Sequence, residues 1–329
     1  MTGAGAPITQ SRLEGLIPPL ALPMHDDETI DIESLQRQAV WLTGRGANGL
    51  WVNGTTGEFH ALTPQERSDV VRYVKQCVPP DTVLIAQIGT PATRSTLELA
   101  EAAVAAGADA LAVVTPYYLR TDDQELRDHY SAIKRAASVP LLIYQVPLMA
   151  KTMMRIQSVV ELAREGVIDG IKDSSNDIAW FRSLLVRMAT ETIAFRAFVG
   201  GGSLVDVSLM AGASGAMCAI ANIAPAHCAR LVEAGLRADW DLASQLQNEL
   251  IELVASLELP NRPEWSGSLA AFKFVLAERG IIDTAVCARP VRPIDDAEAR
   301  LLRATAIPLV ERLEDAATLE PAVHQRNQA

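Results

Sequence analysis

One lysine in this chain of 329 residues stands where an amine could do covalent chemistry. Lys172 ends an apolar run at 167–172. Burial at an apolar strand end disfavours the ammonium form and lowers the pKa, and the neutral amine is the form that attacks a ketone. The pattern indicates a Schiff-base lysine, with an ion pair between Lys172 and Asp173 as the alternative. The lysines that end no such run are Lys75, Lys134, Lys151 and Lys273.

A tyrosine and a glycine-rich turn could assist this amine. Tyr144 precedes Lys172 by 172 − 144 = 28 residues, about one βα unit, and also ends an apolar run. A phenol beside the amine could transfer protons, although a rim tyrosine with its hydroxyl in water fits equally well. Gly54, Thr55 and Thr56 follow another apolar run, and their amides could form a nest for a carboxylate. The alternative is a tight turn that needs glycine.

Eight βα units are expected to position these residues. Short apolar runs alternate with stretches of helical periodicity, which indicates parallel buried strands. The predicted strands are 16–22, 49–52, 83–87, 110–114, 141–145, 168–172, 197–200 and 215–219. Eight units over roughly 220 residues fit an α/β fold of the (β/α)8 TIM barrel type better than a doubly wound sheet. The carboxyl ends of the strands should then carry the working residues.

Local signals support the helices and turns of this barrel. The run 63–66 reads as a capping box with proline at the first helical position, so a helix should continue to about Cys77. The stretches 45–48, 106–109 and 211–214 each place glycine just before a strand, as a helix end does. We predict a barrel at 14–236, a C-terminal helical region at 237–316, and tails at 1–13 and 317–329. The appended helices are expected near 240–256, 265–279 and 296–314.

The composition narrows the class of protein. A net charge of −11, with no basic run, disfavours nucleic acid as a partner. The residues Cys77, Cys218, Cys228 and Cys287 form no C-x-x-C pair, which fits a reduced compartment. The N-terminus has no basic stretch followed by an apolar one, and no apolar run reaches the roughly 18 residues of a membrane span. We therefore predict a soluble, cytoplasmic protein without a membrane partner.

Five motifs in order resemble the dihydrodipicolinate synthase and N-acetylneuraminate lyase family of class I, Schiff-base aldolases, over about 15–314. They are GTTGE at 54–58, TPYY at 115–118, YQVP at 144–147, GIKDSS at 170–175 and the GA-x-G…AN-x-AP run at 212–225.

The resemblance implies specific roles. Lys172 would form an imine with pyruvate or another 2-oxo acid, and the amides of Thr55 and Thr56 would hold its carboxylate. Tyr144 would relay protons, linked through Thr55 to Tyr118 of a neighbouring subunit. The family further implies a homotetramer built as a dimer of dimers, and the sequence predicts neither a cofactor nor a metal.

Two departures concern the part of the site that selects the second substrate. Dihydrodipicolinate-forming members carry an arginine where this chain has Met149, and a thioether cannot replace a bidentate guanidinium. Sialic-acid lyases place acidic residues where this chain has glycines at 200–202. We expect the part of the site that binds the second substrate to be rather apolar and to lie near Phe59, Met149 and Met217. Gly54 and Gly200 are also expected to contact substrate. For Met217, ordinary core packing is the stronger interpretation.

The leading hypothesis is retro-aldol cleavage, condensation or dehydration of a 2-oxo acid, such as a 2-keto-3-deoxy sugar acid or a 4-hydroxy-2-oxo acid. One alternative is 4-hydroxy-tetrahydrodipicolinate synthesis from pyruvate and aspartate semialdehyde. A second is a non-catalytic 2-oxo-acid sensor. A metal-dependent aldolase is disfavoured because the five histidines do not cluster in the sequence. They are His25, His60, His129, His227 and His324.

Overall fold

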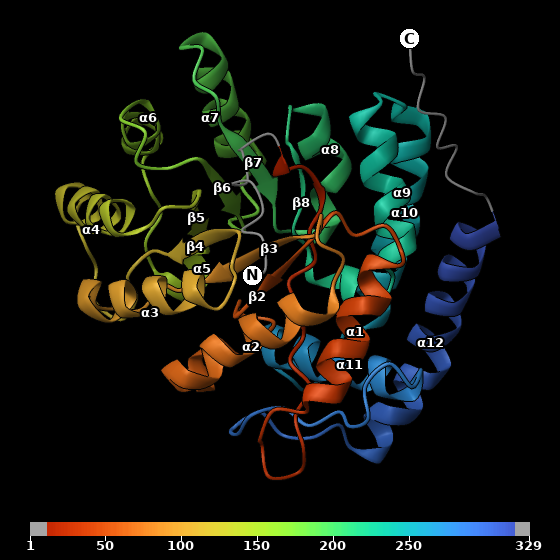
Figure 1. Ribbon diagram of the computed structural model, residues 1–329. Helices are drawn as coiled ribbons and strands as arrows, with labels where there is room; N and C mark the ends of the chain where they lie inside the picture. Colours follow the sequence, from red (N-terminus) through yellow and green to blue (C-terminus); the bar gives the residue numbers. More distant parts are fainter. Residues whose placement is uncertain (1–11, 320–329) are drawn as a thin grey trace.

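Eight parallel strands form a barrel in the computed structural model, which describes residues 12–319 (Figure 1). They are β1 (Gly15–Leu16), β2 (Gly49–Val52), β3 (Val83–Gln87), β4 (Ala110–Val114), β5 (Leu141–Gln145), β6 (Gly170–Asp173), β7 (Arg196–Val199) and β8 (Gly215–Ala216). The ladder runs β1-β8-β7-β6-β5-β4-β3-β2. A parallel bridge between Pro19 and Trp51 joins its two ends, with the Trp51 amide donating to the Pro18 carbonyl at 3.0 Å.

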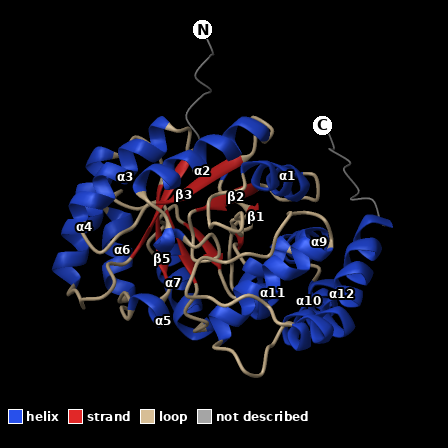
Figure 2. Ribbon diagram, turned by 90° about the horizontal axis from the view of Figure 1, so that it is seen from below, coloured by secondary structure: helices blue, strands red, loops and turns tan. Residues whose placement is uncertain are grey.

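Helices surround the strands (Figure 2). Those that alternate with strands are α1 (Ile32–Thr43), α2 (Pro64–Cys77), α3 (Thr93–Ala105), α4 (Asp123–Ala136), α6 (Ile156–Arg164), α7 (Ile178–Thr190), α8 (Val205–Met210) and α9 (Pro225–Leu236). A one-turn helix, α5 (Pro147–Ala150), follows β5. The predicted capping box of α2 is present, because Thr63 and Glu66 each accept the other's backbone N–H. The prediction of a (β/α)8 barrel is confirmed.

Four turn residues fix the amino-terminal ends of neighbouring strands. Each one directly precedes an even-numbered strand, and its side chain accepts a backbone N–H from the start of the odd-numbered strand before it. The pairs are Asn48 with Leu16 (2.8 Å), Asp109 with Leu84 (2.8 Å), Asp169 with Leu141 (2.9 Å) and Ser214 with Ala197 (3.3 Å). This repeat sets the strand register at the end of the barrel opposite the predicted site.

Strand limits were predicted correctly for β2 to β5 and incorrectly for the others. The predicted strand 16–22 is wrong beyond Leu16, because Pro18 and Pro19 have no N–H to extend the ladder. The predicted strand 168–172 is displaced toward Asp173, since Asp169 forms the turn described above. Observed β7 starts and ends one residue before the predicted 197–200. The predicted 215–219 ends early because the chain enters a 3-10 turn at Ala219–Asn222.

Two hydrophobic clusters fill the structure. The larger one lies between the sheet and the surrounding helices. The smaller one fills the barrel and includes Ile17, Trp51, Tyr144, Phe198 and Met217. Since these side chains come from strands all around the barrel, the interior is a packed core and the barrel is open only at its ends.

Three helices follow the barrel: α10 (Trp240–Ser256), α11 (Glu264–Glu278) and α12 (Asp296–Leu319). α10 and α12 contact α9, and α11 contacts α12 and the turn at Ala219–Asn222. The predicted end of the last helix at 314 is wrong, because α12 continues to Leu319. The division of the chain at residue 237 stays a prediction, and the predicted tails lie almost wholly outside the described residues.

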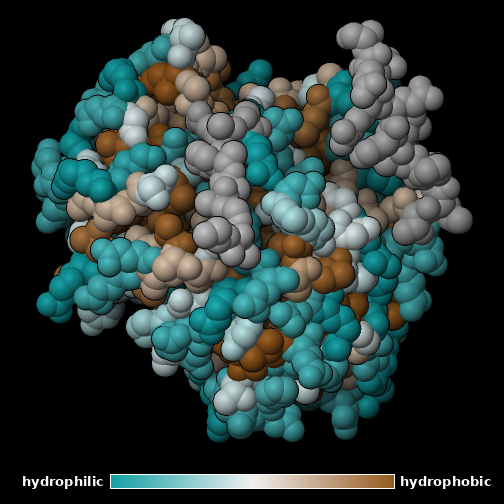
Figure 3. Space-filling view, in the orientation of Figure 1, coloured by the Kyte–Doolittle hydropathy of each residue, from teal (hydrophilic) through white to brown (hydrophobic). Residues whose placement is uncertain are grey.

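Charged and polar residues cover most of the face seen in Figure 3, with hydrophobic patches between them. Within residues 12–319, no helix is both long and apolar enough to cross a membrane.

Replacing Asp109 by alanine is expected to destabilise the barrel. Its carboxylate accepts the Leu84 N–H and pairs with Lys75 at 2.6 Å, so the change removes both contacts and leaves a part-buried N–H unpaired. The free energy of unfolding, measured in urea, should fall by about 1 to 3 kcal/mol. Glu252→Ala is the control, because Glu252 is exposed and pairs with Arg312 at 3.3 Å. An effect of Asp109→Ala no larger than the control's, at most about 1 kcal/mol, would contradict the role of this turn.

Candidate active site

Lys172 lies inside the carboxyl end of the barrel without a neighbouring carboxylate. It is 4% exposed, and its Nζ lies 4.6 Å from the ring centre of Trp51 and 4.7 Å from that of Tyr144. Burial lowers the pKa of Lys172 from its ordinary value of 10.5 to about 7. A large share of the amine is therefore neutral near pH 7.

The alternative ion pair between Lys172 and Asp173 is wrong. Successive side chains of a strand point to opposite faces, so Asp173 faces out of the barrel while Lys172 faces in. The Asp173 carboxylate accepts hydrogen bonds from Gln145 at 2.9 Å and from the amide and hydroxyl of Ser175 at 3.1 and 2.9 Å. In the described part of the chain, Lys172 has no carboxylate in an ion pair.

Tyr144 is held beside Lys172 by strand register and by hydrogen bonds. The two residues are paired across β5 and β6. The Tyr144 hydroxyl lies 3.0 Å from Oγ1 of Thr55, and its ring meets Trp51 edge-on with centres 5.3 Å apart. Burial raises the pKa of Tyr144, and hydrogen bonds from Thr55 and Ser174 offset part of the rise. Because Tyr144 is 2% exposed, the alternative of a rim tyrosine with its hydroxyl in water is wrong.

The glycine-rich loop after β2 forms a compact turn over the barrel mouth. The amides of Gly57 and Glu58 donate within the turn, each at 3.1 Å, to the carbonyls of Gly54 and Thr55. Among the described residues, no backbone hydrogen bond uses the amides of Thr55 and Thr56. A Cβ added to Gly54 would lie 2.7 Å from the Trp51 indole nitrogen, so this position requires glycine. The loop therefore leaves two amides available for an anion such as a carboxylate.

A second buried lysine, Lys273, holds the glycine-rich loop in place through Glu58. Glu58 and Lys273 form an ion pair in which both side chains are 0% exposed. Glu58 also accepts the Ala288 N–H at 2.7 Å, and Lys273 donates to the Val286 carbonyl at 2.6 Å. This pair was not predicted, although the lysine within the apolar run 270–276 was a signal that could have indicated it. The charges of Glu58 and Lys273 balance each other, whereas Lys172 forms no ion pair with a carboxylate among the described residues.

A cavity of about 370 Å³ opens beside the loop and includes Thr55 and Thr56 in its lining. Further lining residues from the barrel part of the chain are Phe59, Tyr117, Val146 and Met149. The opposite wall comes from α11, through Trp265, Leu269 and Phe272, and from Val291 beyond it. This wall was not predicted from the sequence. None of the described lining residues is a lysine, arginine, aspartate or glutamate.

Six of the predicted site residues do not line this cavity: Lys172, Tyr144, Gly54, Tyr118, Met217 and Gly200. Tyr118 has a left-handed backbone with φ of 79° and is 87% exposed, so within one chain it does not reach Tyr144. Met217 is fully buried in the core of the barrel. Gly200 packs against Ser174, where an added Cβ would lie 2.0 Å from the serine hydroxyl.

No group of three or more His, Cys, Asp or Glu side chains within residues 12–319 is arranged to hold a metal ion.

Comparison with known proteins gives one consistent family. The sequence matches the Dihydrodipicolinate synthetase family over residues 12–307. It is 32% identical to an uncharacterised DapA-like lyase of Halobacterium salinarum, over 92% of this chain and 95% of that protein. It is also 32% identical to the 4-hydroxy-tetrahydrodipicolinate synthase of Methanothermobacter thermautotrophicus, over 77% of this chain and 89% of the relative.

A solved structure agrees with these sequence matches. The chloride-inhibited dihydrodipicolinate synthase of Acinetobacter baumannii, in complex with pyruvate, superposes with a TM-score of 0.83 at 29% identity and covers 91% of this chain and 99% of its own. The family match spans nearly all of the described residues, and the barrel and the buried lysine agree with the predicted resemblance. The chain therefore belongs to the dihydrodipicolinate synthetase family of lyases.

Proposed function

We propose that this lyase acts through a Schiff base between Lys172 and the 2-oxo group of pyruvate or a related 2-oxo acid. The observation that carries the proposal is the Lys172 amine, which is 4% exposed, has no carboxylate partner in the described chain and has a pKa lowered to about 7. Such an amine is a nucleophile near neutral pH. The pyruvate complex of the Acinetobacter baumannii relative supports the choice of ligand.

In this mechanism the amides of Thr55 and Thr56 bind the carboxylate, which orients the keto carbon toward Lys172. The amine adds to that carbon, and the carbinolamine loses water to give the imine. Loss of a proton from C3 gives an enamine that attacks an aldehyde, and the reverse sequence is retro-aldol cleavage. When the bound acid carries a hydroxyl on C4, its enamine expels that hydroxyl as water once the hydroxyl has taken a proton, and this is the dehydration. The Tyr144 hydroxyl, 3.0 Å from Thr55, relays the protons.

The proposed assembly is a homotetramer, a dimer of dimers, in a cytoplasmic protein. Its support is Tyr118, whose side chain is 87% exposed on a backbone with φ of 79°. A left-handed conformation is unfavourable for a tyrosine, and such strain persists where function uses it. A neighbouring copy that receives this ring would link it to Thr55 and Tyr144 of its own site.

Synthesis of 4-hydroxy-tetrahydrodipicolinate is the second candidate, favoured by relatives of that name at 31 to 35% identity. Against it stands Met149, which lines the cavity where the synthase pattern has an arginine for a carboxylate. A non-catalytic sensor would bind pyruvate without turnover. Lys172, Tyr144 and Thr55 supply the nucleophile and the proton relay of the proposed mechanism. We therefore favour catalysis on a 2-oxo acid over binding alone.

Incubation with pyruvate and borohydride should reduce the imine and leave a 1-carboxyethyl group on Nζ of Lys172. Peptide mass spectrometry is expected to locate the adduct there and to find none after Lys172→Ala. Lys151→Ala is the matched control, since Lys151 is an exposed lysine near the barrel mouth and its loss should leave the adduct intact. An adduct that persists in Lys172→Ala would refute the proposed mechanism.

The rate of imine formation should increase with pH through a midpoint near 7 rather than near 10.5, because only the neutral amine attacks and burial lowers the pKa of Lys172. Rapid quenching with borohydride at pH values from 5 to about 9 measures this rate on Lys172. A rate that is still increasing steeply at about pH 9, as for a lysine with the ordinary pKa, would contradict the burial argument.

Tyr144→Phe should lower kcat by about 100-fold or more, because it removes the proton relay but not the amine. Adduct formation with pyruvate should become slow without being abolished. Tyr130→Phe is the matched control, since Tyr130 is also fully buried and donates its hydroxyl to the Val113 carbonyl away from the site. Equal effects of the two changes on kcat would show that Tyr144 acts only through packing.

A further inference from the structure

The cavity beside Thr55 differs chemically from a site for an acid or a sugar. A second carboxylate on the aldehyde substrate needs a cation, and the described lining residues include no lysine or arginine. Arg67 lies close by but is 5% exposed, behind the ring of Phe59, with its guanidinium donating to the Gln87 carbonyl at 2.8 Å. The described lining thus gives a substrate carboxylate no lysine or arginine to pair with, and the imidazole of His60 is its basic side chain.

Aromatic and aliphatic side chains dominate two facing walls. On the barrel side, Phe59 is held between Arg67, 5.3 Å from its ring centre, and Tyr117, which it meets edge-on with centres 6.2 Å apart. On the other side, Leu269 and Phe272 of α11 face the same space. A flat ring can make offset or edge contacts with such a platform, and a cavity of about 370 Å³ lies within the size range of ligand sites.

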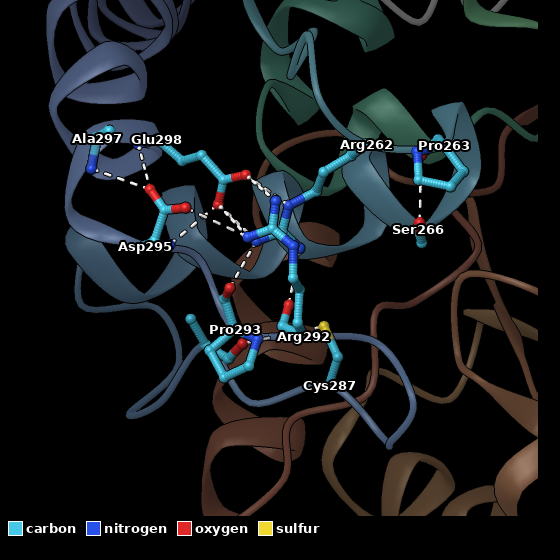
Figure 4. A network of polar contacts seen from close by, with 10 residues as sticks. Arg262, Pro263, Ser266, Cys287, Arg292, Pro293, Asp295, Ala297 and Glu298 are labelled. Carbon is cyan, nitrogen blue, oxygen red and sulfur yellow. Dashed lines mark hydrogen bonds and ion pairs between the residues drawn. The ribbon is translucent and has the colours of Figure 1, made fainter.

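The far wall is fixed in place by a buried arginine (Figure 4). Arg262, just before α11, pairs with Glu298 at the start of α12 at 2.5 Å, and its side chain is 2% exposed. It also donates to the carbonyls of Arg292 and Pro293, at 2.7 and 2.5 Å, directly after the lining residue Val291. α11 and the chain at Val291 are therefore held together before any substrate binds.

We infer that the aldehyde partner in the reaction at Lys172 is an apolar, aromatic aldehyde, whose ring occupies the cavity between Phe59 and α11. This inference rests on the proposed function, and it narrows the substrate to 4-hydroxy-2-oxo acids with an aryl group on C4. Thr55 connects the two halves of the site, because it lines the cavity and lies 3.0 Å from the Tyr144 hydroxyl.

The reaction requires no oxidant or reductant. The enamine carbon C3 attacks the aldehyde carbon, one C–C bond forms, and the aldehyde oxygen takes a proton delivered through Tyr144. Water then hydrolyses the imine, which releases the 4-hydroxy-2-oxo acid and regenerates the Lys172 amine. Cleavage follows the same steps in reverse and releases pyruvate and the aryl aldehyde.

The test compares aldehydes with the full-length protein and pyruvate. Benzaldehyde, glyceraldehyde and aspartate semialdehyde are supplied separately, and products are quantified by chromatography with mass detection. The kcat/KM for benzaldehyde should exceed each of the others by at least about tenfold, the discrimination that apolar groups give in an apolar pocket. A polar aldehyde that equals or exceeds benzaldehyde would overturn the inference.

Substitutions at two neighbouring positions, one lining the cavity and one outside it, test whether the cavity determines the preference for benzaldehyde. Met149→Arg places a cation in the cavity and should lower kcat/KM for benzaldehyde by about tenfold or more while improving the relative rate with aspartate semialdehyde. Leu148→Arg is the control, because Leu148 is 66% exposed and lies outside the lining. Equal losses in the two variants, or no loss in Met149→Arg, would overturn the assignment. Leu269→Asn tests the α11 wall independently and should also weaken the preference for benzaldehyde.

Borohydride trapping with pyruvate distinguishes the two levels of the proposal. An adduct on Lys172 together with no preference for benzaldehyde overturns the aromatic substrate class alone. Absence of the adduct overturns the Schiff-base function and the substrate class with it. Trapping on each variant also shows whether its site has kept its structure.

Discussion

An amine kept inside the barrel with no carboxylate partner among the described residues is the constraint on which the proposed site depends. Lys172 is surrounded by the rings of Trp51 and Tyr144, and burial lowers its pKa to about 7. Lys273 shows the contrasting solution, since it is equally buried but pairs with Glu58. An ion pair balances the charge of a buried ammonium group, whereas an apolar surrounding leaves that charge uncompensated and favours the neutral amine. The two lysines differ in their neighbours and not in their depth.

The barrel and the proximity of Lys172 to Tyr144 could be predicted because their signals are local. Parallel buried strands appear as short apolar runs, and residues that end them must meet at one mouth, as Lys172 and Tyr144 do across β5 and β6. The strand prediction failed where the sequence is apolar but its residues cannot form the hydrogen bonds of a strand. Residues 16–22 are almost wholly apolar, but Pro18 and Pro19 lack the N–H groups that a ladder needs, so the barrel closes there through the single bridge from Pro19 to Trp51.

The selective half of the site could not be predicted, because it depends on contacts between distant segments. Leu269 lies more than 200 residues after Thr55 in the chain, yet both line one cavity. The largely apolar sequence of α11 predicts only that the helix is buried, not which part of the barrel it covers. Met149 indicated in the sequence that its position lacks a cation, and the described lining of the cavity likewise includes no lysine or arginine. The sequence at Met149 could not indicate that aromatic residues of α11 line the same cavity.

Buried contacts join the glycine-rich loop after β2 to the cavity wall formed by α11 and Val291. These contacts limit how the substrate specificity of the proposed site can change. Glu58 ends the glycine-rich motif and pairs with Lys273, which lies on α11 one residue after the lining residue Phe272. Its second oxygen accepts the Ala288 N–H, three residues before Val291. Losing either partner of a buried pair leaves an uncompensated charge, so α11 cannot move away without disturbing the amides of Thr55 and Thr56. A different aldehyde must therefore be accommodated by exchanging side chains on a fixed wall, such as Met149 and Leu269, and not by displacing the helix.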